Sequence, residues 1–143
     1  MKKEIKLLLV IVFFISLALL MITCGEVDTY TNGGTWTHPS DVTDNISPDG
    51  QDASDMQVAM DDNGNAIIVW DQSDGINDQI FKSEYHSGQW THPSGLTDNI
   101  SPDVQFANAP QVAMDDNGNA IIVWEQYDES NYQIFKSEYR SEQ

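Results

Sequence analysis

Two identical acidic segments, Asp61–Asn65 and Asp115–Asn119, carry the side chains best suited to chemistry, and both read DDNGN. Carboxylate and amide oxygens are the ligands that calcium prefers. The candidate metal ligands are therefore Asp61, Asp62, Asp115 and Asp116. Their spacing departs from the twelve-residue calcium loop, and Asp, Asn and Asn-Gly are also the residues of tight turns. We expect turns that need no cofactor, with calcium binding as the alternative.

Groups for catalysis are few elsewhere in the sequence. His38 and His92 occupy matching WTHPS segments, and a histidine that recurs in this way is expected to be structural, since one active site needs one set of groups. Arg140 is the only arginine, whereas a sialidase needs several to hold its acidic substrate. There is no serine nucleophile elbow and no phosphate loop. We expect a non-catalytic protein and keep a glycan-acting enzyme as an alternative, because carboxylates are abundant.

The charge of the chain excludes whole classes of partner. Six Lys and Arg stand against 23 Asp and Glu, which gives a formal net charge of −17. Such a surface repels phosphate backbones, so we expect no nucleic acid partner. It also repels anionic lipid, so attachment to a membrane by surface charge is not expected. Cations and basic partners are compatible with this charge.

The first residues have the pattern of an export signal. Met1–Lys6 contains three lysines, Leu7–Ile22 is apolar or small throughout, and the only cysteine, Cys24, follows. A basic start, an apolar core and a polar exit are typical of secretory signals. The apolar core is shorter than the ~20 residues of a membrane-spanning helix.

The position of Cys24 resembles the lipidation site of bacterial lipoproteins. The resemblance implies a lipoprotein-type signal peptide at residues 1–23, acyl chains on Cys24 and a flexible tether at residues 24–35. The protein would then be anchored in the bacterial cell envelope, outside the cytoplasm. Met21, Ile22 and Thr23 depart from the residues that this family places before its cysteine. Cleavage without lipid, which gives a secreted protein, and an uncleaved anchor are the alternatives.

The rest of the chain is a tandem repeat. The fourteen residues Gln57–Trp70 recur unchanged at Gln111–Trp124, and Trp36 recurs as Trp90, so the period is 54 residues. The repeats are residues 36–89 and 90–143. A fixed period of this size indicates that one supersecondary unit is used twice.

Each repeat has the pattern of four antiparallel strands. In the second copy, Gln111–Asp115 alternates, Ala120–Gln126 is a β-branched run that is apolar on both faces, and Tyr132–Tyr139 alternates again. An Asn-Gly turn and a polar loop separate these segments. Residues 36–43 and 90–97 contribute a fourth, outer strand, in which proline is tolerated. No window has helical spacing.

The string VAMDDNGNAIIVWEQYDESNYQIFKSEY resembles the blades of bacterial extracytoplasmic propellers of the TolB-like and sialidase-like kind. The resemblance implies an all-β fold, with two four-stranded antiparallel β-propeller blades after an N-terminal apolar signal helix. It departs from the strict Asp-box of sialidases, because Trp70 follows Gly64 by six positions. The recurring aromatic residues are then expected in the core between blades.

Two blades do not close a propeller, which has about 4 to 8. The outer strand also comes first in the sequence, as in propellers whose first strand completes the last blade. Apolar faces with Ile67, Val69, Ile121 and Val123 would stay uncovered. We therefore expect a homo-oligomer in which chains exchange outer strands, or further blades that are missing from a truncated chain.

The differences between the repeats indicate where a ligand of unknown identity would bind. They gather at residues 50–56 against 104–110 and at 71–78 against 125–132, in loops expected on one face. Free drift of surface loops is the alternative explanation. The candidate residues for a binding or scaffolding module are Asp52, Asp55, Asp71, Asp74, Phe106, Glu125, Tyr127, Asp128 and Tyr132.

Overall fold

The computed structural model describes residue 35 and residues 37–103 and 105–141. The predicted signal segment, Cys24 and the tether before residue 35 lie outside the described residues. The chain divides into two units, Met1–His38 and Pro39–Gln143, and all the strands belong to the second. The described part of the chain contains no helix that is long and apolar enough to cross a membrane.

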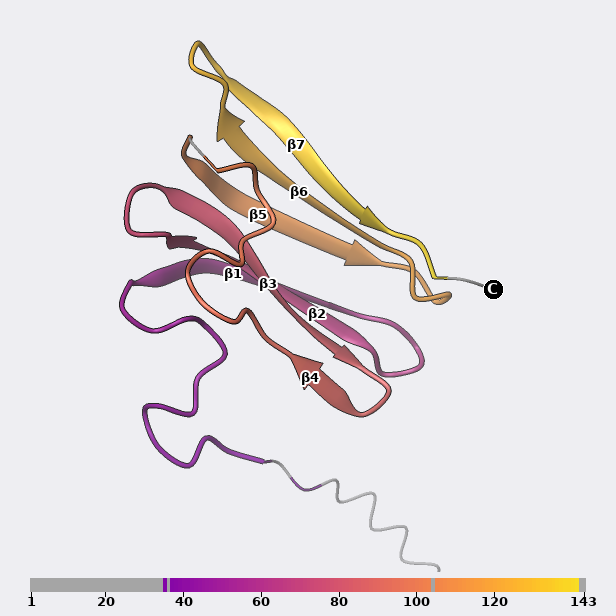
Figure 1. The fold of residues 1–143 in the computed structure, drawn as a ribbon. Helices are drawn as coiled ribbons and strands as arrows, with labels where there is room; N and C mark the ends of the chain where they lie inside the picture. Colours follow the sequence, from indigo (N-terminus) through magenta and orange to yellow (C-terminus); the bar gives the residue numbers. More distant parts are fainter. Residues whose placement is uncertain (1–34, 36, 104, 142–143) are drawn as a thin grey trace, which may run out of the picture. The chain divides into compact units, whose positions relative to one another are not determined.

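Two antiparallel sheets make up the second unit (Figure 1). The first sheet has the order β1-β2-β3-β4 and the second has the order β5-β6-β7. Their strands are β1 (Ala53–Met60), β2 (Ala66–Ser73), β3 (Asp78–His86), β4 (Gln89–Thr91), β5 (Ala107–Met114), β6 (Ala120–Tyr127) and β7 (Tyr132–Tyr139). The prediction of an all-β chain with consecutive antiparallel strands is confirmed for the described residues.

The two sheets repeat each other in detail. Gln57 pairs with Val69 and Gln111 with Val123, and an irregularity of register precedes both pairs at the same place. Both bulges contain a residue with positive φ, Asp55 at 49° and Ala109 at 52°. A bulge bends and twists its strand, so the identical bulges give the sheets the same shape.

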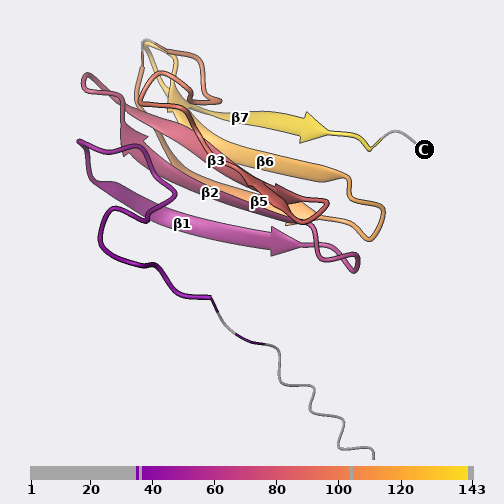
Figure 2. The same ribbon diagram turned by 60° about the horizontal axis from the view of Figure 1, so that its bottom comes forward.

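One face of the first sheet packs on one face of the second. We call the face of β2 and β3 that carries Ile67, Val69 and Ile80 the rear face of the first sheet. Residues Val112, Met114, Ile122 and Trp124 belong to the front face of the second sheet. These rear and front residues form the hydrophobic core together with Ala107, Ala120, Ile100 and Phe135. Strand β5 lies against the first sheet in both views (Figure 2).

The packing of the two sheets explains which residues of β2 and β6 are buried. The prediction that the repeated apolar run is buried on both faces holds for β2 and is wrong for Ala120–Gln126 in β6. Strand β6 has almost the same sequence, but buried and exposed residues alternate along it. Its front face contacts the first sheet, whereas its rear face has no sheet against it among the described residues.

The outer strands differ most from the prediction. Strand β4 ends at Thr91, whereas residues 90–97 were expected to be a strand. Pro93 follows closely, and a proline nitrogen has no hydrogen to give to a sheet. The chain nevertheless runs along β3, because the Ile100 N–H donates to the Ile80 carbonyl at 2.7 Å. Residues 37–43 form no strand, so the second sheet has three described strands where four were expected.

Candidate functional site

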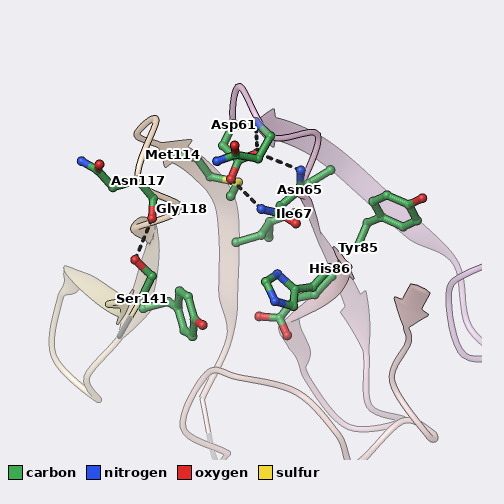
Figure 3. A pocket seen from close by; sticks show the side chains of 13 residues that line it. Asp61, Asn65, Ile67, Tyr85, His86, Met114, Asn117, Gly118 and Ser141 are labelled. Atoms are coloured by element: carbon green, nitrogen blue, oxygen red, sulfur yellow. Dashed lines mark hydrogen bonds between the residues drawn. The ribbon is translucent and has the colours of Figure 1, made fainter. Parts of the chain in front are cut away.

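The unit has a cleft at each end of its strands. The turn-end cleft, of about 230 Å³, lies between the β1–β2 turn and the β5–β6 turn (Figure 3). Its lining is largely apolar and includes Asp61, Asn65, Tyr85, His86, Met114 and Ser141. The two turns contact each other, since the Asn63 side-chain amide donates to the Asp116 carbonyl at 3.5 Å.

The acidic turns use their own carboxylates. Asp61 Oδ1 accepts the backbone N–H groups of Asn63 and Asn65 at 2.9 and 2.8 Å, and its Oδ2 accepts the Asn65 side-chain amide at 2.7 Å. Asp115 makes the same three bonds in the second repeat. The Asn65 amide, with the backbone N–H groups, holds the pKa of Asp61 below its ordinary value. These bonds stabilise the charged form and complete the turn.

These hydrogen bonds show that the carboxylates of Asp61 and Asp115 serve the turns. The hydrogen bonds occupy both oxygens of Asp61 and of Asp115. Asp62 and Asp116 are exposed beside them. Over the ranges that the structure describes, no three His, Cys, Asp or Glu side chains gather at metal-binding spacing. Calcium normally takes six to eight oxygen ligands.

The opposite, loop-end cleft, of about 210 Å³, belongs to the second sheet. It is lined by Gln105, Gln126, Tyr127, Asp128, Glu129 and Phe135, among others. The rings of Tyr127 and Tyr132 lie 5.5 Å apart, and the Tyr127 N–H donates to the Phe106 carbonyl. Of the predicted ligand residues, Tyr127 and Asp128 line this cleft, and Phe106 and Tyr132 each contact Tyr127. The Asp128 carboxylate also accepts the backbone N–H groups of Ser130 and Asn131 and so belongs to a turn. Glu125 is exposed on β6, one residue from the lining residue Gln126.

The other predicted ligand residues, Asp52, Asp55, Asp71 and Asp74, belong to the first sheet. Asp52 and Asp55 are exposed. Asp74 Oδ1 accepts the backbone N–H groups of Ile76 and Asn77, which assigns it to a turn. Asp71 is buried and accepts a hydrogen bond from the Ser54 hydroxyl, but none of the described groups donates to its Oδ1. Burial raises the pKa of Asp71, with a smaller contribution from Asp55.

Two buried glutamines that the sequence analysis did not single out hold the loops in place. The Gln126 side-chain amide donates to the carbonyls of Pro102 and Gln105, and its oxygen accepts the Trp124 indole N–H. Gln72 makes the equivalent bonds to Pro48, Gln51 and Trp70. Both repeats contain Trp-x-Gln at the same position, and this repetition is the sequence feature that marks the two glutamines. By itself the pattern predicts only the end of a strand.

The turn-end cleft was also missed. Tyr85 and Tyr139 were expected in the core, yet both line this cleft, and Tyr139 is exposed. His86 is exposed at the edge of the same cleft. Trp124 and the half-buried Phe135 stack on each other in the core between the two sheets, as expected. Trp70 and Phe81 are also stacked and buried, but outside that core. Comparison of the chain with family models, curated proteins and solved structures finds no match.

Proposed function

We propose that this chain is an exported, lipid-anchored binding module built from propeller-type blades, and that it is not an enzyme. The repeated four-strand pattern, the shared bulge and the packing of one sheet on the next support the propeller reading. The signal-like segment and Cys24 support export and anchoring. Apart from the buried Asp71, the candidate acidic side chains serve turns or stand exposed, and this supports a role in binding.

One observation carries the binding role. At and around the loop-end cleft, Phe106, Tyr127, Glu129 and Tyr132 differ from their counterparts in the first repeat, whereas Asp128 matches Asp74. Phe106 and Tyr132 are exposed, and Tyr127, Asp128 and Glu129 line the cleft together. The first repeat has Asp52 and Asp78 at the positions of Phe106 and Tyr132. Aromatic faces next to carboxylates attract cations, so the proposed ligand is a protein segment rich in Lys or Arg.

Tyr132→Ala tests this site, with Tyr139→Ala as its matched control. Both tyrosines lie on β7 and are similarly exposed, at 56% and 52%, but they stand at opposite ends of the strand. Titration with short Lys- and Arg-containing peptides, followed by tyrosine and tryptophan fluorescence, should give about tenfold weaker binding for Tyr132→Ala, the loss of one cation–π contact of ~1–2 kcal/mol. Equal binding by the two variants would move the ligand site away from the loop-end cleft.

Cys24→Ser tests the anchor. Expressed in a bacterial host, the natural chain should fractionate with membranes, and its intact mass should show acyl groups on Cys24. Several acyl chains hold a protein on a membrane stably, whereas none can attach to serine. The variant should be released or left unprocessed. A soluble natural chain without acyl mass would contradict the anchor and leave the binding site to be judged by the peptide titration.

A further inference from the structure

The residues that form the contact between the two sheets occur a second time in the chain, on faces that do not contact each other. The rear face of the first sheet packs on the front face of the second. Because the repeats have nearly the same sequence, the second sheet has a rear face of its own with Ile121, Val123 and Ile134. The first sheet likewise has a front face of its own with Val58 and Met60.

The rear face of the second sheet is exposed at Ile121 and Ile134, and the front face of the first sheet is exposed along β1, although Trp70 and Phe81 on that front face are buried. Ile80 is fully buried, whereas its counterpart Ile134 is 72% exposed. Val58 and Met60 are each 65% exposed, whereas their counterparts Val112 and Met114 pack against the core. The exposed residues are therefore the two halves of an interface whose first copy is already formed inside the chain. Isolated apolar residues on a surface need no explanation, but two complementary faces do.

The outer edges of the two sheets also differ, because one is covered by another segment of the chain and the other is exposed. Residues 91–101, at the start of the second repeat, run along the outer edge of β3 in the first sheet. There the Ile100 N–H donates to the Ile80 carbonyl, and the Ser101 hydroxyl accepts the Ile80 N–H at 3.0 Å. We call this segment the strap. It protects an edge that would otherwise be free to pair with another chain.

The sequence contains a second strap that has no described edge to cover. Residues 43–49 and residues 97–103 both read TDNISPD. Residues 37–45 are exposed, and Ile46 and Ser47 stand where the second copy has Ile100 and Ser101. The outer edge of β7, which presents Gln133 and Ile134, is exposed as well. The second strap, residues 37–47, is thus available to cover the exposed outer edge of β7.

We propose that a second copy of this chain covers these surfaces. The front face of its first sheet packs on the rear face of the second sheet, and its residues 37–47 run along the outer edge of β7. A second copy fits because it carries the faces and the strap that already make this contact once. The contact is head-to-tail, so it forms a ring if the rotation closes and a filament if it does not. The inference needs neither the lipid anchor nor the peptide ligand.

Three single substitutions in the full chain test the proposal. Ile134→Arg blocks the rear face, Val58→Arg blocks the front face, and Ile76→Arg is the control, an isoleucine 84% exposed in the β2–β3 loop. Light scattering after size exclusion, in one detergent buffer, measures the mass. The natural chain and Ile76→Arg should be discrete oligomers or filaments. Ile134→Arg and Val58→Arg should each be monomers with an unchanged circular dichroism spectrum and melting temperature.

A mixture of the two blocked chains gives the decisive result. Ile134→Arg retains a natural front face, and Val58→Arg retains a natural rear face, so an equal mixture should form a dimer and nothing larger. Ile46→Asp, in the second strap at residues 37–47, should weaken association of the natural chain at least tenfold. A monomeric natural chain, an oligomer that survives Ile134→Arg, or a mixture that stays monomeric would overturn the proposal. Association through residues 1–34 would survive every substitution and is thereby distinguished.

Discussion

At the scale of single residues, the acidic side chains behave in opposite ways. Hydrogen bonds from the neighbouring Asn side chains and backbone lower the pKa of Asp61 and Asp115. The stability that these turns contribute is therefore present above the ordinary Asp pKa of about 3.9 and is lost as the pH falls through the lower folded value. Burial instead raises the pKa of Asp71. Protonation of Asp71 thus stabilises the fold at low pH, and this contribution is lost as the pH rises through the raised value.

Asp71→Asn should accordingly stabilise the protein at pH 7. The variant removes a buried carboxylate with one oxygen that lacks a described partner, and a gain of about 1 kcal/mol in the free energy of unfolding is expected. The gain should shrink toward pH 4, where the natural side chain can take up a proton. Urea unfolding at both pH values measures it, and exposed Asp52→Asn should change neither. A loss of stability at pH 7 would mean that an unseen cation or donor serves Asp71.

At the scale of elements, a side chain from a strand fixes each loop. Gln126 is buried and bonds the Trp124 indole and the carbonyls of Pro102 and Gln105. Gln126→Leu keeps a side chain of similar volume but leaves these buried groups unpaired. We therefore expect the free energy of unfolding to fall by about 2–4 kcal/mol. Thermal unfolding measures the loss, and Gln89→Leu on exposed β4 is the control. Equal melting temperatures for the two variants would show that the loop keeps its structure without the hydrogen bonds of Gln126.

At the scale of the whole molecule, charge opposes the proposed contact between copies. Each chain carries a formal charge of −17, so identical chains repel each other. Salt reduces this repulsion, since the screening length falls from about 30 Å at 0.01 M to about 3 Å at 1 M. The natural chain should therefore associate more tightly as NaCl is raised, by about tenfold between 0.02 and 0.5 M, on the order of 1.4 kcal/mol. Sedimentation equilibrium measures this, and weakening by salt would point to ion pairs in the contact.

The sequence by itself determined the local structure. The 54-residue period, the Asn-Gly turns and the β-branched runs predict consecutive antiparallel strands, and the three inner strands of each repeat lie near the expected positions, with β1 and β5 beginning four residues earlier. This succeeds because turn residues and alternation act over a few neighbouring positions. The clustering of Phe106, Tyr127 and Tyr132 was also within reach, because the differences between the repeats gather at one end of the strands. The expectation that these residues all lie in loops is wrong, since Tyr127 belongs to β6 and Tyr132 to β7.

Only the tertiary structure decided which of two equivalent residues is buried. Ile80 and Ile134 lie in the same local sequence, QIFKSEY, yet one is covered by the strap and the next sheet while the other is exposed. The short β4 and the bonds of Gln72 and Gln126 to distant loops were likewise beyond local patterns. Burial depends on what packs opposite a residue, and two identical stretches of sequence hold the same local information whether or not a neighbour covers them.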